Sequence, residues 1–253
     1  MIQIYPNYEQ LSLAAATCFS ERSQQSIAKH GYFSVVLSGG MTPKRTYELL
    51  AGPPFRDTIT WENVYVFWGD ERCVPPNDPN SNEHMAHQAL LDHVPIPPTQ
   101  VYPMRCLSDD DVCSAVVDYD IKIQTFFQGR TPQFDFVFLG LGENGHTASL
   151  FPRQGILNEK NKTVVPVFSA QQSRHRITMT ASLINQGQYI CFLVSGLQKA
   201  EILPQVLYGP HDPQSLPAQL IQPVKGELLW LVDQDAAACI SPEKLSDLID
   251  SRI

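Results

Sequence analysis

The feature that most constrains the fold of this chain is an alternation of two patterns. Short segments that are apolar on both faces alternate with longer segments in which apolar residues follow helical spacing. A strand without a polar face is buried on both sides, which is typical of parallel sheets covered by helices. The sequence therefore predicts an α/β fold with a mostly parallel sheet. Strands are expected over residues 32–37, 64–68, 134–139, 164–167, 176–180, 189–194 and 228–232.

Residues that are typical of helix N-termini precede the predicted helices between these strands. Asn7 is placed to cap a long first helix, and Thr42 followed by Pro43 predicts the start of a second. Ser108, with Asp111 three residues later, resembles a capping box. Helices are expected over residues 7–30, 42–50, 108–128, 199–207 and 242–249, and one more, capped by Asn80 or Ser81, is expected to end near residue 92.

The length and composition indicate one globular domain. Hydrophobic residues make up 43% of the 253 residues and charged residues 17%, which is ordinary for a folded soluble protein. The proline-rich patches are short enough to be loops rather than linkers. We therefore expect a single domain over residues 1–253.

Charge and hydropathy exclude two classes of partner. The net charge of −8 argues against nucleic acid, because binding to a phosphate backbone needs clustered Lys and Arg. No apolar run approaches 18 residues, and the N-terminal residues lack a basic region followed by an apolar one. We expect no membrane contact and a cytoplasmic location. The cysteines have no CxxC spacing and are expected to be reduced thiols, mostly in the core; they are Cys18, Cys73, Cys106, Cys113, Cys191 and Cys239.

Four predicted strands end in polar turns. The turns read SGGMTP over residues 38–43, GDER over residues 69–72, GLGENGH over residues 140–146 and SGLQK over residues 195–199. Ligands of open parallel sheets bind outside the carboxyl ends of the strands. The four turns are therefore expected to converge on one site.

The third turn presents a histidine, His146, after three glycines. Glycine permits a tight turn, and an imidazole exchanges protons near neutral pH. The spacing of Gly140, Gly142 and Gly145 also matches a dinucleotide-binding fingerprint. That motif requires a long helix and an acidic residue about 20 positions later. Pro152 and the apolar segment over residues 163–168 meet neither condition, so the sequence favours a proton-transfer site.

The other turns indicate a phosphate site. Ser38, Gly39 and Gly40 precede a helix whose first N–H groups suit an anion, with Thr42 as its expected N-cap. Arg72 is suited to a bidentate contact with phosphate oxygens, and Lys199 is a second candidate. Asp70 is placed to orient a water or a substrate hydroxyl. An ordinary β-to-α turn and a solvated loop are the structural alternatives.

Three histidines on one predicted helix allow a metal site to be considered. His84 and His87 share a face, and His93 follows. No carboxylate or cysteine at ligand spacing completes a set, so a solvated helix face is favoured and no metal is expected.

Five motifs in order resemble the 6-phosphogluconolactonase family. They are SGGMTP, FWGDERCVPPNDPNSN, GLGENGHTASLFP, RITMT and SGLQKAEIL, at residues 38–43, 67–82, 140–152, 176–180 and 195–203. The resemblance implies a three-layer α/β/α fold with a mostly parallel, Rossmann-like sheet. It also implies hydrolysis of 6-phosphoglucono-δ-lactone in the oxidative pentose phosphate pathway. Arg176 is implied as a further phosphate ligand.

One position departs from the family pattern. The family usually has Asp before the Gly-His pair, whereas this chain has Asn144. An amide can accept a hydrogen bond, but it cannot stabilise an imidazolium by charge. Two alternatives stay open: a glucosamine-6-phosphate deaminase-like enzyme, and a non-catalytic protein that binds sugar phosphates. The deaminase usually has a catalytic glutamate after its histidine, and here the residues over 147–152 contain no acid.

The expected mechanism uses His146 as a general base toward water, with Asp70 and Asn144 as catalytic neighbours. Backbone N–H groups near Gly142 and Gly145 are expected to stabilise the oxyanion. The expected ligand is a sugar-phosphate lactone, and no cofactor or obligate protein partner is expected. The 6-phosphate is expected to bind Ser38, Gly39, Gly40, Thr42, Arg72, Arg176 and Lys199.

Overall fold

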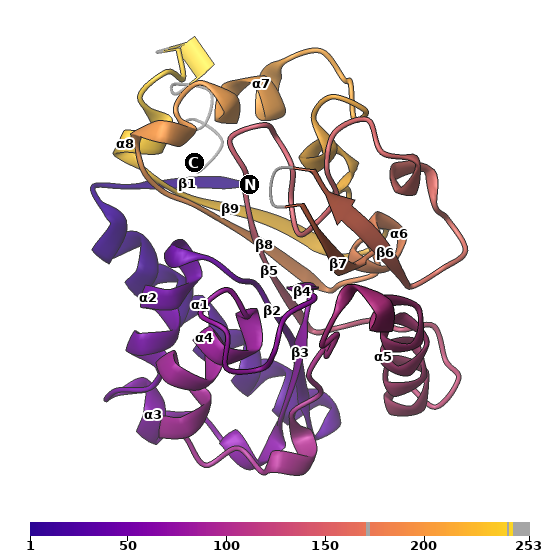
Figure 1. The fold of residues 1–253 in the computed structure, drawn as a ribbon. Coiled ribbons are helices and arrows are strands. Elements are labelled where there is room, and N and C mark those ends of the chain that lie inside the picture. The colour runs from indigo at the N-terminus through magenta and orange to yellow at the C-terminus, as the bar shows by residue number, and fades with distance from the viewer. Residues whose placement is uncertain (171–172, 242, 245–253) are drawn as a thin grey trace.

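The computed structural model describes residues 1–170, 173–241 and 243–244. Its larger sheet has the strand order β1-β9-β8-β5-β2-β3, and all neighbouring strands in it are parallel. Helices α1 and α2 lie on one side of this sheet and α5 on the other (Figure 1). The predicted three-layer α/β fold is confirmed. The strands are β1 (Ile2–Tyr5), β2 (Phe33–Leu37), β3 (Val64–Trp68), β5 (Phe136–Gly140), β8 (Tyr189–Val194) and β9 (Glu227–Asp233).

A second, three-stranded sheet has the order β4-β7-β6. It consists of β4 (Asp70–Arg72), β6 (Val164–Ser169) and β7 (Arg174–Met179), and all its pairs are antiparallel. The prediction of a polar turn at GDER was therefore wrong. Residues 70–72 form a strand because β7, about a hundred positions later, supplies their hydrogen-bond partners.

The first helix forms as predicted. Helix α1 (Tyr8–His30) begins after Asn7, whose side chain accepts a hydrogen bond from the backbone N–H of Gln10. It ends at Gly31, which has φ of +89°, the left-handed conformation that glycine adopts without strain. Ser81 similarly caps α4 (Asn82–Ala89) by accepting from the N–H of His84. This α-helix stops at Ala89, and a 3₁₀ turn, Leu91–His93, follows.

Three predicted helix starts were wrong. Helix α2 (Met41–Leu50) starts after Gly40 rather than Thr42, because Gly40 takes φ of +103° and turns the chain earlier. Helix α5 (Val112–Phe126) starts after a 3₁₀ turn, and Ser108 bonds the Asp111 carboxylate instead of capping the helix. Lys199 ends a 3₁₀ turn, and the next helix starts beyond it. The remaining helices are α3 (Phe55–Thr58), α6 (Ala181–Ile184), α7 (Ile202–Tyr208) and α8 (Gln234–Ala237).

Aromatic side chains fill the interface between α1 and the larger sheet. The Phe19 ring lies 5.1 Å from Phe33 and 6.2 Å from Phe138, between ring centroids. Trp61 and Trp68 are also buried, as predicted for core residues. Asp135 interrupts this apolar region, and its carboxylate is satisfied by Ser34 and His30. Buried residues of both sheets join one hydrophobic cluster.

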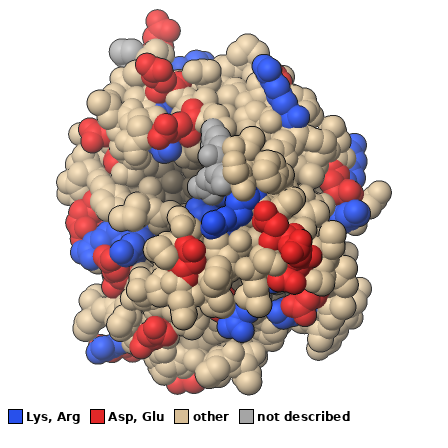
Figure 2. Space-filling view, viewed as in Figure 1, with Lys and Arg blue, Asp and Glu red and all other residues tan. Residues whose placement is uncertain are grey.

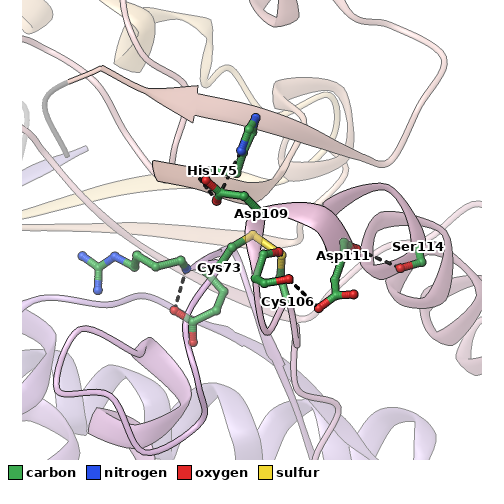
Figure 3. Close-up of a disulfide and its surroundings, with 9 residues drawn as sticks. Cys73, Cys106, Asp109, Asp111, Ser114 and His175 are labelled. Atoms are coloured by element: carbon green, nitrogen blue, oxygen red, sulfur yellow. Dashed lines mark hydrogen bonds and ion pairs between the residues drawn. A yellow bond between two sulfur atoms is a disulfide. The ribbon is translucent and has the colours of Figure 1, made fainter. Parts of the chain in front are cut away.

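Two of the cysteines correct the expectation of reduced thiols. Cys73 and Cys106 are joined by a disulfide, and their Cα atoms are 4.5 Å apart across a sequence separation of 33. Figure 3 shows this bond beside Asp109, whose carboxylate accepts a hydrogen bond from the His175 backbone N–H. The pairing depends on long-range folding, so no local cysteine spacing could indicate it. The other four cysteines are free thiols.

Most of the predicted helix over residues 242–249 lies outside the described residues. Among the helices that the structure describes, none is both long and apolar enough to cross a membrane. On the face drawn in Figure 2, basic and acidic side chains are interspersed.

Candidate active site

The four sequence motifs meet at the carboxyl end of the larger sheet. They line one cavity of about 390 Å³. Helix α4 adds Asn82 to its wall and β7 adds Arg176. Of the predicted site residues, the cavity lining includes Ser38, Gly39, Gly40, Thr42, Asp70, Arg72, Gly142, His146, Arg176 and Lys199. Asn144 reaches the site through its bond to His146, whereas the Gly145 backbone packs against Leu216.

His146 stands in the turn after β5. Its ring packs against Phe151, with 4.8 Å between the centroids. Gly142 lies under the ring, and a Cβ at that position would come within 2.0 Å of His146 Nδ1. Only a glycine therefore leaves room for the imidazole in this position.

The electrostatic setting keeps His146 neutral. Burial lowers the pKa of His146 to about 4, and the charges of Arg176, Lys199 and Arg72 act in the same direction. Asp70 opposes this shift. At neutral pH the imidazole is therefore unprotonated and able to accept a proton.

Asn144 selects which ring nitrogen of His146 is the base. Its Oδ1 atom lies 2.5 Å from His146 Nδ1 and also accepts a hydrogen bond from the His146 backbone N–H at 3.3 Å. The backbone donor identifies this side-chain atom as the amide oxygen. Because an amide oxygen only accepts, Nδ1 carries the proton and Nε2 carries the lone pair.

Asp70 is buried and fully engaged at one oxygen. Its Oδ2 atom accepts a hydrogen bond from Ser149 Oγ at 2.6 Å and lies 3.5 Å from Arg176 Nη1. The Ser149 hydroxyl also lies 3.3 Å from Arg176 Nη1. These contacts fix the carboxylate at the cavity wall.

Three basic side chains give the cavity a positive lining within an acidic protein: Arg72, Arg176 and Lys199. Arg72 Nη1 donates to the Asn80 carbonyl at 2.8 Å and to Asn82 Oδ1 at 2.5 Å. Arg72 Nε is buried without a hydrogen-bond partner among the described residues. Burial lowers the pKa of Lys199, and Glu143, 3.9 Å from it, opposes that shift. A buried, unpaired donor beside two further cations suits an anionic group.

The glycine turn after β2 forms another wall of the cavity. The backbone of Ser38 is held by Tyr47, whose hydroxyl accepts from the Ser38 N–H and donates to the Ser38 carbonyl, both at 2.9 Å. The Ser38 N–H is therefore occupied. The N-terminus of α2 follows at Met41, where the first helical N–H groups favour an anion.

The predicted oxyanion donors are also occupied. The Gly142 N–H donates to the His146 carbonyl at 2.8 Å, and the Gly145 N–H donates to the Gly142 carbonyl at 3.0 Å. Both bonds close the turn that presents His146. The expectation that these two N–H groups face an oxyanion was therefore wrong, because they hold the turn together.

Two of the three helix histidines have partners outside any metal arrangement. His87 Nδ1 lies 2.8 Å from an Asp92 oxygen, and His93 Nε2 lies 2.9 Å from the Gln88 carbonyl. Within residues 1–170, 173–241 and 243–244, no three His, Cys, Asp or Glu side chains are grouped to hold a metal ion.

A family model described as glucosamine-6-phosphate isomerases/6-phosphogluconolactonase matches residues 6–230. The chain belongs to this family. A 6-phosphogluconolactonase of Synechocystis sp. is 39% identical over 244 residues, which cover 95% of this chain and 98% of the relative. One of Nostoc sp. is 36% identical over 243 residues, with 95% and 98% covered. The 6-phosphogluconolactonase structure from Trypanosoma brucei is similar with a TM-score of 0.84 at 25% identity, covering 95% of this chain and 98% of that one.

Two residues of this family member contact the predicted site and were missed from the sequence. Ser149 lies three positions after His146, inside the recognised motif, and bonds Asp70. Asn82 ends the second motif and bonds Arg72. Both are small polar residues, which in sequence are indistinguishable from turn or cap residues. Their burial becomes visible only when β4, α4 and the His146 turn are brought together.

Proposed function

We propose that this protein hydrolyses 6-phospho-D-glucono-1,5-lactone to 6-phospho-D-gluconate, a step of the oxidative pentose phosphate pathway. The observation that carries the proposal is the neutral His146 in a cavity lined by Arg72, Arg176 and Lys199. Such a cavity offers a base for water and countercharge for a phosphate. The relatives named 6-phosphogluconolactonase at 36–39% identity support the same substrate.

His146 Nε2 is the general base of the proposed reaction. It takes a proton from water while the water oxygen forms a bond to the lactone carbonyl carbon. The tetrahedral intermediate then expels the ring oxygen, which receives that proton as the ring carbon–oxygen bond breaks. Water is consumed, the products are a hydroxyl and a carboxylic acid that ionises, and His146 is regenerated. General acid–base catalysis of this kind typically contributes about 10²- to 10⁴-fold.

The positive lining has two roles in this proposal. Arg72 and Lys199, with the glycine turn after β2, hold the 6-phosphate and orient the ring. Arg176, which the family resemblance implied as a phosphate ligand, is assigned here to the carbonyl oxygen instead: it lies beside Asp70 and supplies positive potential where that oxygen becomes negative. The lactone carbonyl is already electrophilic, so the reaction needs no metal or cofactor. Asp70, fixed by Ser149, is placed to accept a hydrogen bond from the attacking water or a substrate hydroxyl.

We also propose that the protein is a single domain that acts in the cytoplasm. The disulfide between Cys73 and Cys106 is uncommon in that compartment.

The deciding experiment is acid release from freshly prepared lactone, with spontaneous hydrolysis subtracted. We expect rapid release with the wild-type protein and a large loss with His146→Ala. Ammonia release from glucosamine 6-phosphate would instead identify a deaminase. Binding of 6-phosphogluconate without turnover of the lactone would identify a non-catalytic sugar-phosphate-binding protein, and either result would overturn the proposal.

A further inference from the structure

Asn82 is a buried polar residue with an unusual position. It is the first residue of α4, its side chain lines the cavity, and only 2% of the residue is exposed. A buried amide needs partners for both its oxygen and its nitrogen. The partners of Asn82 belong to the segment that carries the proposed site residues.

The Asn82 amide bonds two residues of β4. Its Oδ1 accepts from Arg72 Nη1 at 2.5 Å, and its Nδ2 donates to the Asp70 carbonyl at 2.8 Å. The same Nδ2 lies 3.5 Å from the Asp70 carboxylate. The amide therefore sets the position of the Arg72 guanidinium relative to Asp70.

The backbone of Gly39 packs directly against the side-chain amide of Asn82. A Cβ at Gly39 would lie 1.8 Å from Asn82 Oδ1, a distance that no two such atoms can adopt. The glycine turn, β4 and α4 thus meet at the Asn82 side chain. This contact explains why the first glycine of the turn is needed: its missing side chain is where the amide sits.

Glu71 anchors the backbone of Asn82. Its buried carboxylate accepts from the N–H groups of Asn82 and Glu83, both at 2.8 Å, and from Ser81 Oγ at 3.0 Å. The start of α4 is therefore clamped to β4. A clamped backbone gives the Asn82 side chain little freedom to follow a displaced Arg72.

We propose that Asn82 is a positioning residue that holds the Arg72 guanidinium in place for the phosphate of the substrate. The inference rests on the proposed function, which assigns Arg72 to that phosphate. Asn82 occupies Nη1, so the other donors of Arg72, including the unpaired Nε, remain for an anion. Without Asn82, the guanidinium keeps the Asn80 carbonyl as an acceptor but loses its second one, and the phosphate must complete its ordering on binding.

A purely structural role for Asn82 predicts different kinetics. A residue that only stabilises α4 would change the melting temperature and affect all substrates alike. A residue that positions Arg72 raises KM for the phosphorylated lactone by a larger factor than it changes the hydrolysis of unphosphorylated glucono-δ-lactone. The comparison of these two substrates separates the two roles.

The test uses Asn82→Ala in the full chain, with Arg72→Ala and the double variant. We expect Asn82→Ala to raise KM for the phosphorylated lactone by about tenfold or more, the size of a lost bond to a charged group. The double variant should be no worse than Arg72→Ala alone, because both remove the same interaction. Asn82→Asp keeps an acceptor for Arg72 but loses the donor to the Asp70 carbonyl and adds a negative charge beside the anion site, so it should also raise KM for the phosphorylated lactone.

Ser81→Ala is the matched control. It removes the cap of the same helix and a bond to the same Glu71, and these bonds of the Ser81 hydroxyl do not involve Arg72. It should lower the melting temperature without changing the KM ratio between the two substrates.

Two outcomes separate the inference from the function on which it rests. If Arg72→Ala affects both substrates equally, the phosphate assignment of Arg72 is wrong. If Arg72→Ala acts selectively while Asn82→Ala changes both substrates equally, or the two effects add, Asn82 does not position Arg72. If Asn82→Ala fails to fold, Asn82→Ser in the same substrate comparison decides: a rise in KM that is largest for the phosphorylated lactone supports the inference, and no change, or an equal change for both lactones, overturns it.

Discussion

The side-chain oxygen of Asn144 lies 2.5 Å from Nδ1 of His146. This short contact places a neutral acceptor at the position where the family resemblance implies a carboxylate. The orientation and the tautomer of the His146 ring are retained, because both need only a hydrogen-bond acceptor at Nδ1. Charge stabilisation of an imidazolium is lost, and the base is correspondingly weaker than it would be beside Asp.

Removal of the base is the most direct test of the mechanism. We expect His146→Ala to lower kcat by about 10²- to 10⁴-fold, the usual contribution of a general base. Circular dichroism and the melting temperature should show that the variant remains folded. His211→Ala removes an exposed histidine and should leave kcat unchanged. Equal turnover by His146→Ala and wild type would remove His146 from the mechanism.

The pH profile should report the low pKa of His146. Only the neutral imidazole accepts a proton, so kcat/KM should be retained below pH 6 and fall as the pH drops through about 4. Asn144→Asp places a carboxylate beside Nδ1, which favours the imidazolium and raises the pKa of His146. The acid limb of this variant should therefore move to higher pH. Identical profiles for the two proteins would show that charge at position 144 has no influence on the base.

Lys199 should act mainly on the phosphorylated substrate. We expect Lys199→Ala to raise KM for the 6-phospholactone by about tenfold or more, as expected for a charge-assisted bond. Turnover of glucono-δ-lactone should not change. Lys160→Ala removes the same charge from an exposed position and serves as the control. An equal effect of Lys199→Ala on both lactones would contradict the phosphate role.

Two glycines give a matched steric test. A Cβ at Gly142 would come within 2.0 Å of the His146 ring, whereas a Cβ at Gly155, outside the cavity lining, meets nothing within 4 Å. Gly142→Ala should therefore displace the imidazole and lower kcat by about a hundredfold, the order of effect of misplacing a catalytic group by about 1 Å. Gly155→Ala should be close to wild type. Similar kinetics for both variants would show that the ring position is not critical.

The disulfide should contribute to stability. A bond that closes a loop of this length, with a sequence separation of 33, is expected to stabilise the protein by about 3–4 kcal/mol. The double variant Cys73→Ser/Cys106→Ser should lose that free energy of unfolding in denaturant titrations, and dithiothreitol should destabilise only the wild type. Cys113→Ser changes an exposed free thiol and should have no effect. No difference between the double variant and the wild type would argue against the bond in solution.

Strand ends and long-range pairing differ in how well a sequence predicts them. The convergence of the SGGMTP, GLGENGH and SGLQK turns was predictable, because parallel strands bring their carboxyl ends to one edge. The strand at residues 70–72 was not, since its partner β7 lies about a hundred residues away. The disulfide was not predicted for the same reason, because its two cysteines come together only in the folded chain. Gly40 displaced the expected Thr42 cap because backbone dihedrals, rather than side-chain type, decided where α2 begins.

The candidate site shows the same division. Residue types with distinctive chemistry, His146, Arg72 and Lys199, were identifiable one by one. The residues that hold the site in place were not identifiable. Ser149 and Asn82 reach their partners, Asp70 and Arg72, only because the tertiary structure brings these atoms within hydrogen-bond distance. The oxyanion prediction failed because the backbone N–H groups of a tight turn are consumed by the turn itself.

The three consecutive charged residues of strand β4 point to two different sides of the strand. Asp70 and Arg72 line the cavity, while Glu71 between them faces away and binds the start of α4. This division follows from the period of two along a strand. A single inserted or deleted residue here would exchange the two sets, putting a lone acid into the cavity and an acid–base pair against the helix. The spacing of this short segment is thus as restrictive as its composition, and length variation should be tolerated in the loop after Arg72 rather than within the strand.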